Sequence, residues 1–279
     1  MSLKVKTKEE EILLCDITGL DRIGLYTQGI SLSSTQEKIF EQALKKRSQG
    51  VPLQYVMGKT EFYGLPIRLE PGIFIPRPET EVLVEAVIRH CEEPRRGDEA
   101  ISLERGDCFA SLRSARNDVS VLDLCTGSGC IAISLAKFAK CGRIIATDIS
   151  EKSVEIAKKN AILNNVSDKI EFKQADLFEG LAGRFDIIVC NPPYIKRQDI
   201  KMLPVEVSFD PAIALDGGGD GFDFYRKISR FAPSFLNKGA ILVMELGDGQ
   251  AEAVKNMFPG KTEIIIDLNG IERVLIWTR

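Results

Sequence analysis

The sequence predicts an α/β protein with a doubly wound, mostly parallel sheet that ends in an antiparallel hairpin, preceded by a small helical domain. Two patterns carry this prediction. From residue 119 onward, short apolar runs rich in β-branched residues alternate with longer segments whose apolar residues recur at helical spacing, as in βαβ units. Near the C-terminus, Asn269-Gly270 joins two strand-like runs and is a strong hairpin signal. The predicted strands are 119–124, 143–147, 170–174, 185–190, 240–246, 264–268 and 273–278, and the predicted helices are 130–139, 150–164 and 222–236.

Residues 1–60 are predicted to form the small helical domain. Thr7-x-x-Glu10 and Ser34-x-x-Glu37 match the capping box that marks the start of a helix. No residue of this segment needs a chemical role to explain it. We therefore expect the domain to recognise a macromolecular substrate.

Residues 61–78 are predicted to be a hairpin linker with Gly64 and Pro66 in its turn, and residues 79–279 to form the main domain. Within that domain, the polar and aperiodic stretch 91–118 is far longer than the roughly 2–6 residues usual between a helix and a strand. We expect it to be an exposed insertion. Acidic residues interleave its arginines, which argues against a basic arm that binds nucleic acid.

The composition excludes several classes of function. A net charge of −3 and an isoelectric point of about 5.5 argue against strong sequence-independent binding to duplex DNA, and no stable nucleic-acid binding is expected. The seven cysteines form no CxxC pair and the chain has one histidine, so no metal site, disulfide framework or histidine-based triad is expected. Neither a signal peptide nor a membrane-spanning apolar stretch is visible, which predicts a cytoplasmic protein with reduced thiols and no membrane contact.

The first predicted strand of the main domain runs into a glycine loop, Cys125-Thr126-Gly127-Ser128-Gly129, and a helix follows at once. Glycines at this place let a ligand approach the backbone, and the N–H groups of the helix start point at that ligand. The loop has neither the GxGxxG pattern of nicotinamide dehydrogenases nor the GKS/T of phosphate-binding loops. A different nucleotide-like ligand is therefore expected.

Acidic residues follow the next two predicted strands. Asp148 lies roughly 20 residues after Gly127, where a carboxylate can accept both hydroxyls of a nucleoside ribose. Its alternative role is to cap the following helix, which Ser150 could do instead. Asp176 with Leu177 suits the edge and the face of an adenine ring, and the alternative is that Asp176 is simply a turn residue.

The fourth predicted strand ends in Asn191-Pro192-Pro193-Tyr194. The two prolines hold the loop extended at the carboxyl edge of the sheet, where doubly wound sheets bind ligands. Such a loop suits a planar NH2 group, because the Asn191 side-chain carbonyl and a backbone carbonyl of the Pro-Pro turn can each accept one hydrogen while the Tyr194 ring offers a stacking face. The alternative is that the prolines merely end the strand and Asn191 is a turn residue.

Three segments together resemble the HemK/PrmC family of S-adenosylmethionine-dependent methyltransferases: Gln54-Tyr55-x-x-Gly58, Phe62-Tyr63-Gly64 and Pro76-Arg77-Pro78-Glu79-Thr80-Glu81. Enzymes of that family methylate N5 of the glutamine in the Gly-Gly-Gln loop of class I peptide chain release factors. The resemblance runs from about Glu11 to the C-terminus, interrupted at 91–118. It implies a Rossmann-like methyltransferase sheet, and the antiparallel C-terminal hairpin agrees with that variant.

The resemblance also implies roles for individual residues. The cofactor S-adenosylmethionine, which leaves as S-adenosylhomocysteine, would contact Cys125, Thr126, Gly127, Ser128, Gly129, Asp148, Asp176, Leu177 and Asn191. The substrate amide would be held by Asn191, Pro192, Pro193 and Tyr194, with Asn191, Pro192 and Tyr194 as the catalytic residues. Arg77 and Glu81 would shape the cleft. The chain departs from the family pattern at Cys125, which replaces a commoner glycine, and at Asp210, which begins a motif often written Glu-Pro-x-x-Ala-Leu.

Three other functions remain open. Adenine and guanine amino groups are also planar, so a nucleic-acid amino-methyltransferase is the main alternative, against which the acidity of the chain and segment 76–81 argue. A nicotinamide oxidoreductase would need the missing GxGxxG pattern. A non-catalytic nucleoside-binding scaffold would keep Asp148 and the glycines without a need for Asn191.

Overall fold

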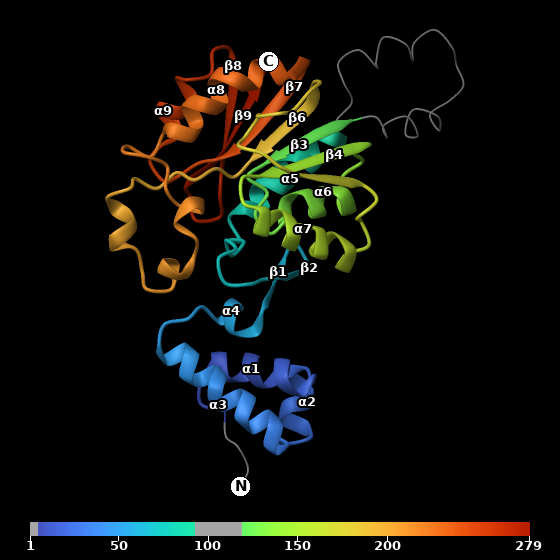
Figure 1. Ribbon diagram of the computed structural model, residues 1–279, viewed down its shortest axis with the longest axis vertical. Coiled ribbons are helices and arrows are strands. Elements are labelled where there is room, and N and C mark those ends of the chain that lie inside the picture. Colours follow the sequence, from blue (N-terminus) through green and yellow to red (C-terminus); the bar gives the residue numbers. More distant parts are fainter. Residues whose placement is uncertain (1–4, 93–118) are drawn as a thin grey trace, which may run out of the picture.

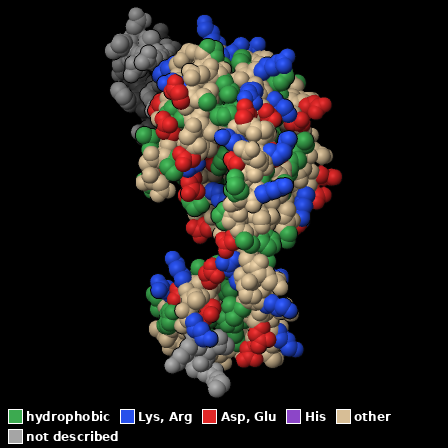
Figure 2. Space-filling view, turned by 90° about the vertical axis from the view of Figure 1, so that its left-hand side faces the viewer, with side chains coloured by type: hydrophobic (Ala, Val, Ile, Leu, Met, Phe, Trp, Pro, Cys, Tyr) green, Lys and Arg blue, Asp and Glu red, His purple; other side chains and the backbone are tan. Residues whose placement is uncertain are grey.

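The computed structural model describes residues 5–92 and 119–279, and its N-terminal helices form a lobe joined to the rest of the molecule by a narrow waist (Figures 1 and 2). A small apolar core holds these helices together, made of Leu13, Leu14, Leu25, Phe40 and Ala43. The helices of the lobe are α1 (Lys8–Thr18), α2 (Arg22–Thr27), α3 (Ser34–Ser48) and α4 (Leu53–Met57). The helical character predicted for this region is confirmed.

The two predicted helix starts have different outcomes. Thr7 caps α1, with its hydroxyl accepting the N–H of Glu10. The capping box of α3 is formed by Ser33 and Gln36, so the predicted box at Ser34 is wrong by one residue. Ser34 is already the first helical residue, whereas Ser33 has the extended backbone that a cap requires.

An antiparallel hairpin of β1 (Lys59–Phe62) and β2 (Leu65–Arg68) follows the helical lobe. Its turn is Tyr63-Gly64, and Pro66 lies within β2 instead of in the turn. A two-stranded sheet consists only of edge strands, where a proline without an N–H is tolerated. The next helix, α5 (Thr80–Glu92), includes the first two residues of the predicted insertion, and the rest of that insertion lies outside the described residues.

A seven-stranded sheet forms the main domain, in the order β5-β4-β3-β6-β7-β9-β8. The first five strands in that order are parallel, and β9 pairs antiparallel with both of its neighbours. This confirms the α/β fold class and the antiparallel C-terminal hairpin. The strands are β3 (Ser120–Leu124), β4 (Arg143–Asp148), β5 (Ile170–Gln174), β6 (Phe185–Cys190), β7 (Leu236–Glu245), β8 (Lys261–Ile266) and β9 (Glu272–Thr278).

Helices cover both faces of this sheet (Figure 1). Side chains alternate between the two faces along each strand, so Val121 and Ile187 pack with one set of helices while Leu122 and Ile188 pack with the other. The first set is α5, α6 (Cys130–Phe138) and α7 (Glu151–Leu163), and the second is α8 (Asp223–Phe235) and α9 (Ala251–Lys255). Between β6 and α8 the chain forms three 3₁₀ turns, η2 (Asp199–Met202), η3 (Val207–Phe209) and η4 (Ala212–Ala214).

The strand order places a topological switch point at β3. Chain order runs outward from β3 through β4 and β5 on one side and through β6 and β7 on the other. Doubly wound sheets bind their ligands in the crevice that opens there, beyond the carboxyl ends of the strands. The glycine loop and Asn191 follow strands that end at this crevice, and Asp148 is the last residue of such a strand.

Candidate active site

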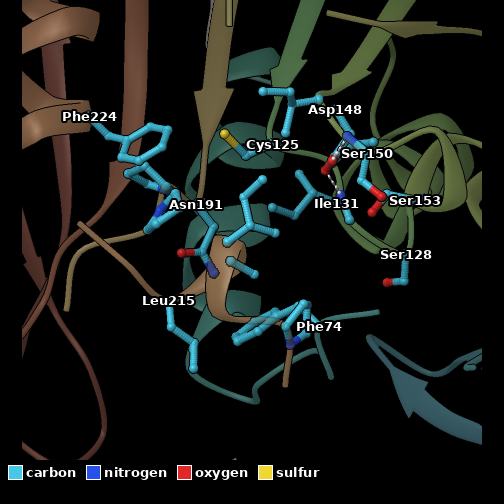
Figure 3. A pocket seen from close by; sticks show the side chains of 18 of the residues that line it. Phe74, Cys125, Ser128, Ile131, Asp148, Ser150, Ser153, Asn191, Leu215 and Phe224 are labelled. Carbon is cyan, nitrogen blue, oxygen red and sulfur yellow. Dashed lines mark hydrogen bonds between the residues drawn. The ribbon is translucent and has the colours of Figure 1, made fainter. Parts of the chain in front are cut away.

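A cavity at this edge of the sheet brings most of the predicted site residues together (Figure 3). They come from the ends of β3, β4, β5 and β6, although they are spread along the chain from Cys125 to Tyr194. The predicted residues that line the cavity are Cys125, Thr126, Gly127, Ser128, Asp148, Asp176, Leu177, Asn191, Pro192, Pro193 and Tyr194.

Of the residues predicted to contact cofactor or substrate, Gly129 does not line the cavity, and neither do Arg77 and Glu81, which were predicted to shape the cleft. The φ of Gly129 is +84°, and a Cβ built on it would lie 2.9 Å from Cβ of Ala157 on α7. The glycine therefore lets the start of α6 pack closely against α7, which is a role in packing. Cys125 has φ +58°, a backbone conformation that favours glycine, so a cysteine at this position carries strain.

Asp148 ties the glycine loop to the end of β4. One carboxylate oxygen accepts the N–H of Gly127 at 2.9 Å, and the other accepts the N–H of Ser150 at 2.9 Å. Ser150 caps α7 by accepting the N–H of Ser153, so helix capping does not explain Asp148. Burial raises the pKa of the Asp148 carboxyl, and the backbone N–H groups partly offset that rise.

A buried carboxyl that the sequence analysis did not assign, Asp123, lies next to the glycine loop. Asp123 is buried at the end of β3 and accepts the Thr126 hydroxyl at 2.6 Å. Burial raises the pKa of the Asp123 carboxyl to about 7. Within the described part of the chain, the buried Ser128 hydroxyl has no hydrogen-bond partner, and Ser128 lines the cavity. The loop therefore offers the Ser128 hydroxyl to a ligand in addition to its backbone.

The amide of Asn191 is held by a chain of hydrogen bonds that ends at the buried carboxylate of Glu245. Its Nδ2 donates to Oγ1 of Thr80 at 3.1 Å, and the Thr80 hydroxyl donates to Oε2 of Glu245 at 2.6 Å. The hydroxyl of Tyr194 donates to Oε1 of the same Glu245 at 3.3 Å. Because Nδ2 of Asn191 is engaged, its carbonyl oxygen is the atom left to accept a hydrogen bond from a ligand. Figure 3 places Asn191 at the end of its strand, facing the cavity.

Sequence reasoning missed Thr80 and Glu245 as functional residues. Thr80 lies in the Pro76–Glu81 segment, which the sequence analysis names only as part of the family resemblance. Glu245 is an acid at the end of the apolar run 240–246, and both side chains are buried. An acidic residue at the end of a fully buried strand was the available signal, since burying a carboxyl is costly without partners.

The Pro76–Glu81 segment and Asp210 also connect the helical lobe to the cavity. Asp210 is buried and pairs with Arg77, accepts the N–H of Ile75 at 3.2 Å, and lies 3.2 Å from the Tyr55 hydroxyl of α4. Glu81 accepts the N–H of Tyr63 in the hairpin turn at 2.8 Å. These contacts fix the lobe, the hairpin and the chain around Asp210 relative to the sheet.

Solved methyltransferases share this doubly wound fold. A methyltransferase from Pyrococcus furiosus has a similar structure, with a TM-score of 0.52 and 19% identity over 88% of this chain and 98% of that one. The hMettl16 catalytic domain gives a TM-score of 0.56 and 17% identity over 90% of this chain and 85% of that one. At these identities the likeness concerns the fold alone.

The sequence relatives are more specific. Residues 6–58 match the family model "PrmC N-terminal domain" and residues 108–219 match "Methyltransferase small domain". A release factor glutamine methyltransferase of Thermodesulfovibrio yellowstonii is 37% identical over 96% of this chain and 91% of its own length. The one from Geobacter sulfurreducens is 38% identical over 96% of this chain and 87% of its own. The chain therefore belongs to the release factor glutamine methyltransferase family.

Family membership makes this protein a methyltransferase whose cofactor is S-adenosylmethionine, as the sequence predicted. The cavity is compatible with that cofactor, because it presents the Asp148 carboxylate, which can accept hydrogen bonds from hydroxyl groups, and the Ser128 hydroxyl. Among the described residues, that hydroxyl has no hydrogen-bond partner. Among the same residues, no helix is both long and apolar enough to cross a membrane.

Proposed function

We propose that this protein methylates N5 of the glutamine in the Gly-Gly-Gln motif of class I peptide chain release factors, in the cytoplasm. One observation carries the proposal. Asn191 is fixed by Thr80 so that its carbonyl oxygen is free to accept, beside a Pro-Pro turn, in the cavity where the glycine loop and Asp148 also lie. The curated relatives carry the substrate in their names, and the site geometry supplies a way to hold an amide.

Each part of the cofactor is proposed to contact particular residues of the cavity. Asp148 accepts the ribose hydroxyls, and Asp176 with Leu177 takes the adenine. The methionine part lies along the glycine loop, residues 125–129, with Gly129 acting through the packing of α6. S-adenosylmethionine, when bound, supplies a methyl group on a positively charged sulfur, which is already an activated electrophile.

The protein's task on the substrate side is to align the amide nitrogen. The Asn191 side-chain oxygen accepts one hydrogen of the glutamine NH2, and the carbonyl of Pro192 accepts the other. Pro193 keeps the turn extended, and the Tyr194 ring provides a flat face for the amide plane. Holding reacting atoms in a near-attack arrangement contributes up to about 7–11 kcal/mol to lowering a barrier.

No side-chain base is required before the transfer. The nitrogen lone pair of an amide is delocalised, and the proton that must leave becomes acidic only as the new N–C bond forms. One N–H bond is exchanged for an N–CH3 bond, S-adenosylhomocysteine leaves, and the proton passes to solvent. The site therefore needs acceptors for the amide hydrogens more than it needs a strong base.

The segment between β6 and α8 is the proposed grip on the release factor. It exposes Met202, Val205 and Ile213, which are 74%, 64% and 54% accessible. Arg47 of α3 pairs with Glu206 of this segment at 2.8 Å, and Ile213, further along the segment, lines the cavity. The apolar strip thus runs from the helical lobe to the site, where a protein carrying the glutamine loop can bury it.

Transfer of labelled methyl to a purified release factor tests the proposal. A Gly-Gly-Ala version of the same factor and total tRNA, rRNA and DNA are assayed alongside. Label on the Gly-Gly-Gln protein alone is expected, because basic and acidic side chains are interspersed on the face seen in Figure 2 and the chain is acidic overall. Label on nucleic acid alone would favour the amino-methyltransferase of nucleic acids instead.

A further inference from the structure

The two side chains proposed to hold the substrate amide are both anchored by one buried carboxylate. Asn191 reaches Glu245 through the Thr80 hydroxyl, over bonds of 3.1 and 2.6 Å, and Tyr194 reaches it directly at 3.3 Å. Thr80, Asn191 and Tyr194 line the cavity, whereas Glu245 lies behind them. Glu245 therefore contacts the groups that face the substrate and not the substrate itself.

The direction of these hydrogen bonds fixes the orientation of the Asn191 amide. A threonine hydroxyl has one hydrogen, and in this structure Thr80 donates it to Glu245. Only lone pairs of Thr80 are then left for Asn191, so Nδ2 has to face Thr80. A flipped amide would set its oxygen against the Thr80 oxygen with no hydrogen between them. An ionised Glu245 thus determines which end of the amide is presented to the cavity.

We infer that Glu245 is a positioning residue for methyl transfer, and that its ionised form holds Asn191, through Thr80, with the carbonyl oxygen toward the substrate. The inference rests on the proposed role of Asn191. When Glu245 takes up a proton it can donate to Thr80, which releases the Thr80 hydrogen and removes the reason for a single amide orientation.

The surroundings of Glu245 place its titration in the neutral range. Burial raises the pKa of this carboxyl to about 7, against the lowering effects of its hydrogen bonds and of a positive charge. The Tyr225 hydroxyl donates to the backbone oxygen of Glu245 at 3.1 Å and does not reach its carboxyl. The groups that act on the pKa of the carboxyl are Thr80 from α5, Tyr194 from the loop after β6, Arg273 from β9 and Glu79 from the segment before α5. The charge of Glu245 in turn acts on Cys190 at the end of β6, Cys130 at the start of α6 and Tyr225 of α8.

A matched pair of substitutions at Thr80 tests the hydrogen-bond chain. Thr80→Val keeps the shape and removes the hydroxyl, and Thr80→Ser keeps the hydroxyl. Because a misplaced reacting group can cost about 100-fold, kcat for the release factor is expected to fall by about that factor in Thr80→Val. Cofactor affinity should show no matching loss, and Thr80→Ser should restore most of the rate.

The pH dependence of kcat tests the role of the charge. At saturating cofactor, the wild-type rate should fall below about pH 7 as Glu245 is protonated. In Glu245→Gln the amide oxygen accepts from Thr80 at every pH, so this acid limb should disappear. The pKa of Asp123 is also raised to about 7, and an acid limb caused by Asp123 would persist in Glu245→Gln.

The outcomes separate this inference from the proposed function. Wild-type transfer to the Gly-Gly-Gln protein is measured first, and its failure would reject the proposed function. With an active wild type, equal rates in the two Thr80 variants, or an acid limb unchanged in Glu245→Gln, would overturn the role of Glu245. Circular dichroism checks folding, and if Thr80→Val does not fold, the Glu245→Gln profile decides.

Discussion

Replacing Asn191 by alanine separates catalysis from cofactor binding. The substitution removes the side-chain oxygen that accepts the substrate N–H and breaks the 3.1 Å bond to Thr80. An unmade hydrogen bond of a buried polar group costs about 1–3 kcal/mol, and lost alignment of the nitrogen adds a factor of about 100. Since about 1.4 kcal/mol is tenfold in rate, kcat should fall by roughly 1,000-fold or more. Thr80 keeps its bond to Glu245, so the fold is expected to persist.

The assay is single-turnover transfer of labelled methyl at saturating cofactor, with cofactor affinity measured by calorimetry on the same preparation. The expected result is a rate loss of that size with nearly unchanged cofactor affinity. Equal losses of rate and of cofactor affinity would refute the assignment, because Asn191 would then act mainly on the cofactor. A rate close to that of the wild type would refute it as well.

Three further substitutions test other parts of the site. Asp148→Ala should weaken S-adenosylmethionine binding by about 10- to 100-fold in calorimetry, because charge-assisted hydrogen bonds contribute about 1.5–3 kcal/mol; an unchanged Kd would contradict its ribose role. Gly129→Ala should lower the free energy of unfolding in urea by about 1–3 kcal/mol, since its Cβ would lie 2.9 Å from Ala157 at φ +84°, and more than Gly239→Ala, where φ is +76° and the space is open. Met202→Ser should raise KM for the release factor about fivefold, because apolar surface that the release factor buries is lost. Ile162→Ser on α7 is the control, since Ile162 is also an exposed apolar side chain but lies outside the proposed grip, and its KM should not change. Equal effects of the two substitutions would reject the proposed grip.

The architecture was predictable because it depends on local patterns. Continuous apolar runs and helical periodicity each follow from which faces an element buries, and these are written in short windows of sequence. The Asn269-Gly270 turn likewise signals its hairpin without distant contacts. The short helix α9 and the 3₁₀ turns between β6 and α8 were not predicted, since elements of three to five residues carry too little periodicity to be recognised.

The boundaries of helices and strands were harder to predict, because neighbouring residues offer competing start signals. Two serines in succession, Ser33 and Ser34, each have a glutamine or glutamate three residues later, and only backbone geometry decides which one caps α3. Strand β7 begins at Leu236, before the predicted start at Ala240, because pairing with β6 extends past the glycine at position 239. Tertiary pairing overrides the local signal at such positions.

The candidate site was partly predictable for a different reason. Asp148 and Asn191 follow apolar strands at the edge where ligands bind, so their position in the sequence indicates their position in space. The pairing of Thr80 with Glu245 joins residues 165 positions apart, and no local pattern indicates it. The sequence could indicate which residues face the cavity, but not which buried groups orient them.

The central claim is that this protein modifies the side-chain amide of one glutamine. The most direct measurement is fragment mass spectrometry of a release factor after incubation with the protein and S-adenosylmethionine. The account predicts a single added methyl group on the glutamine of Gly-Gly-Gln, located on its side-chain nitrogen, and none on that peptide with Asn191→Ala enzyme. A methyl group on another residue, or an unmodified peptide from the active wild-type protein, would contradict the account.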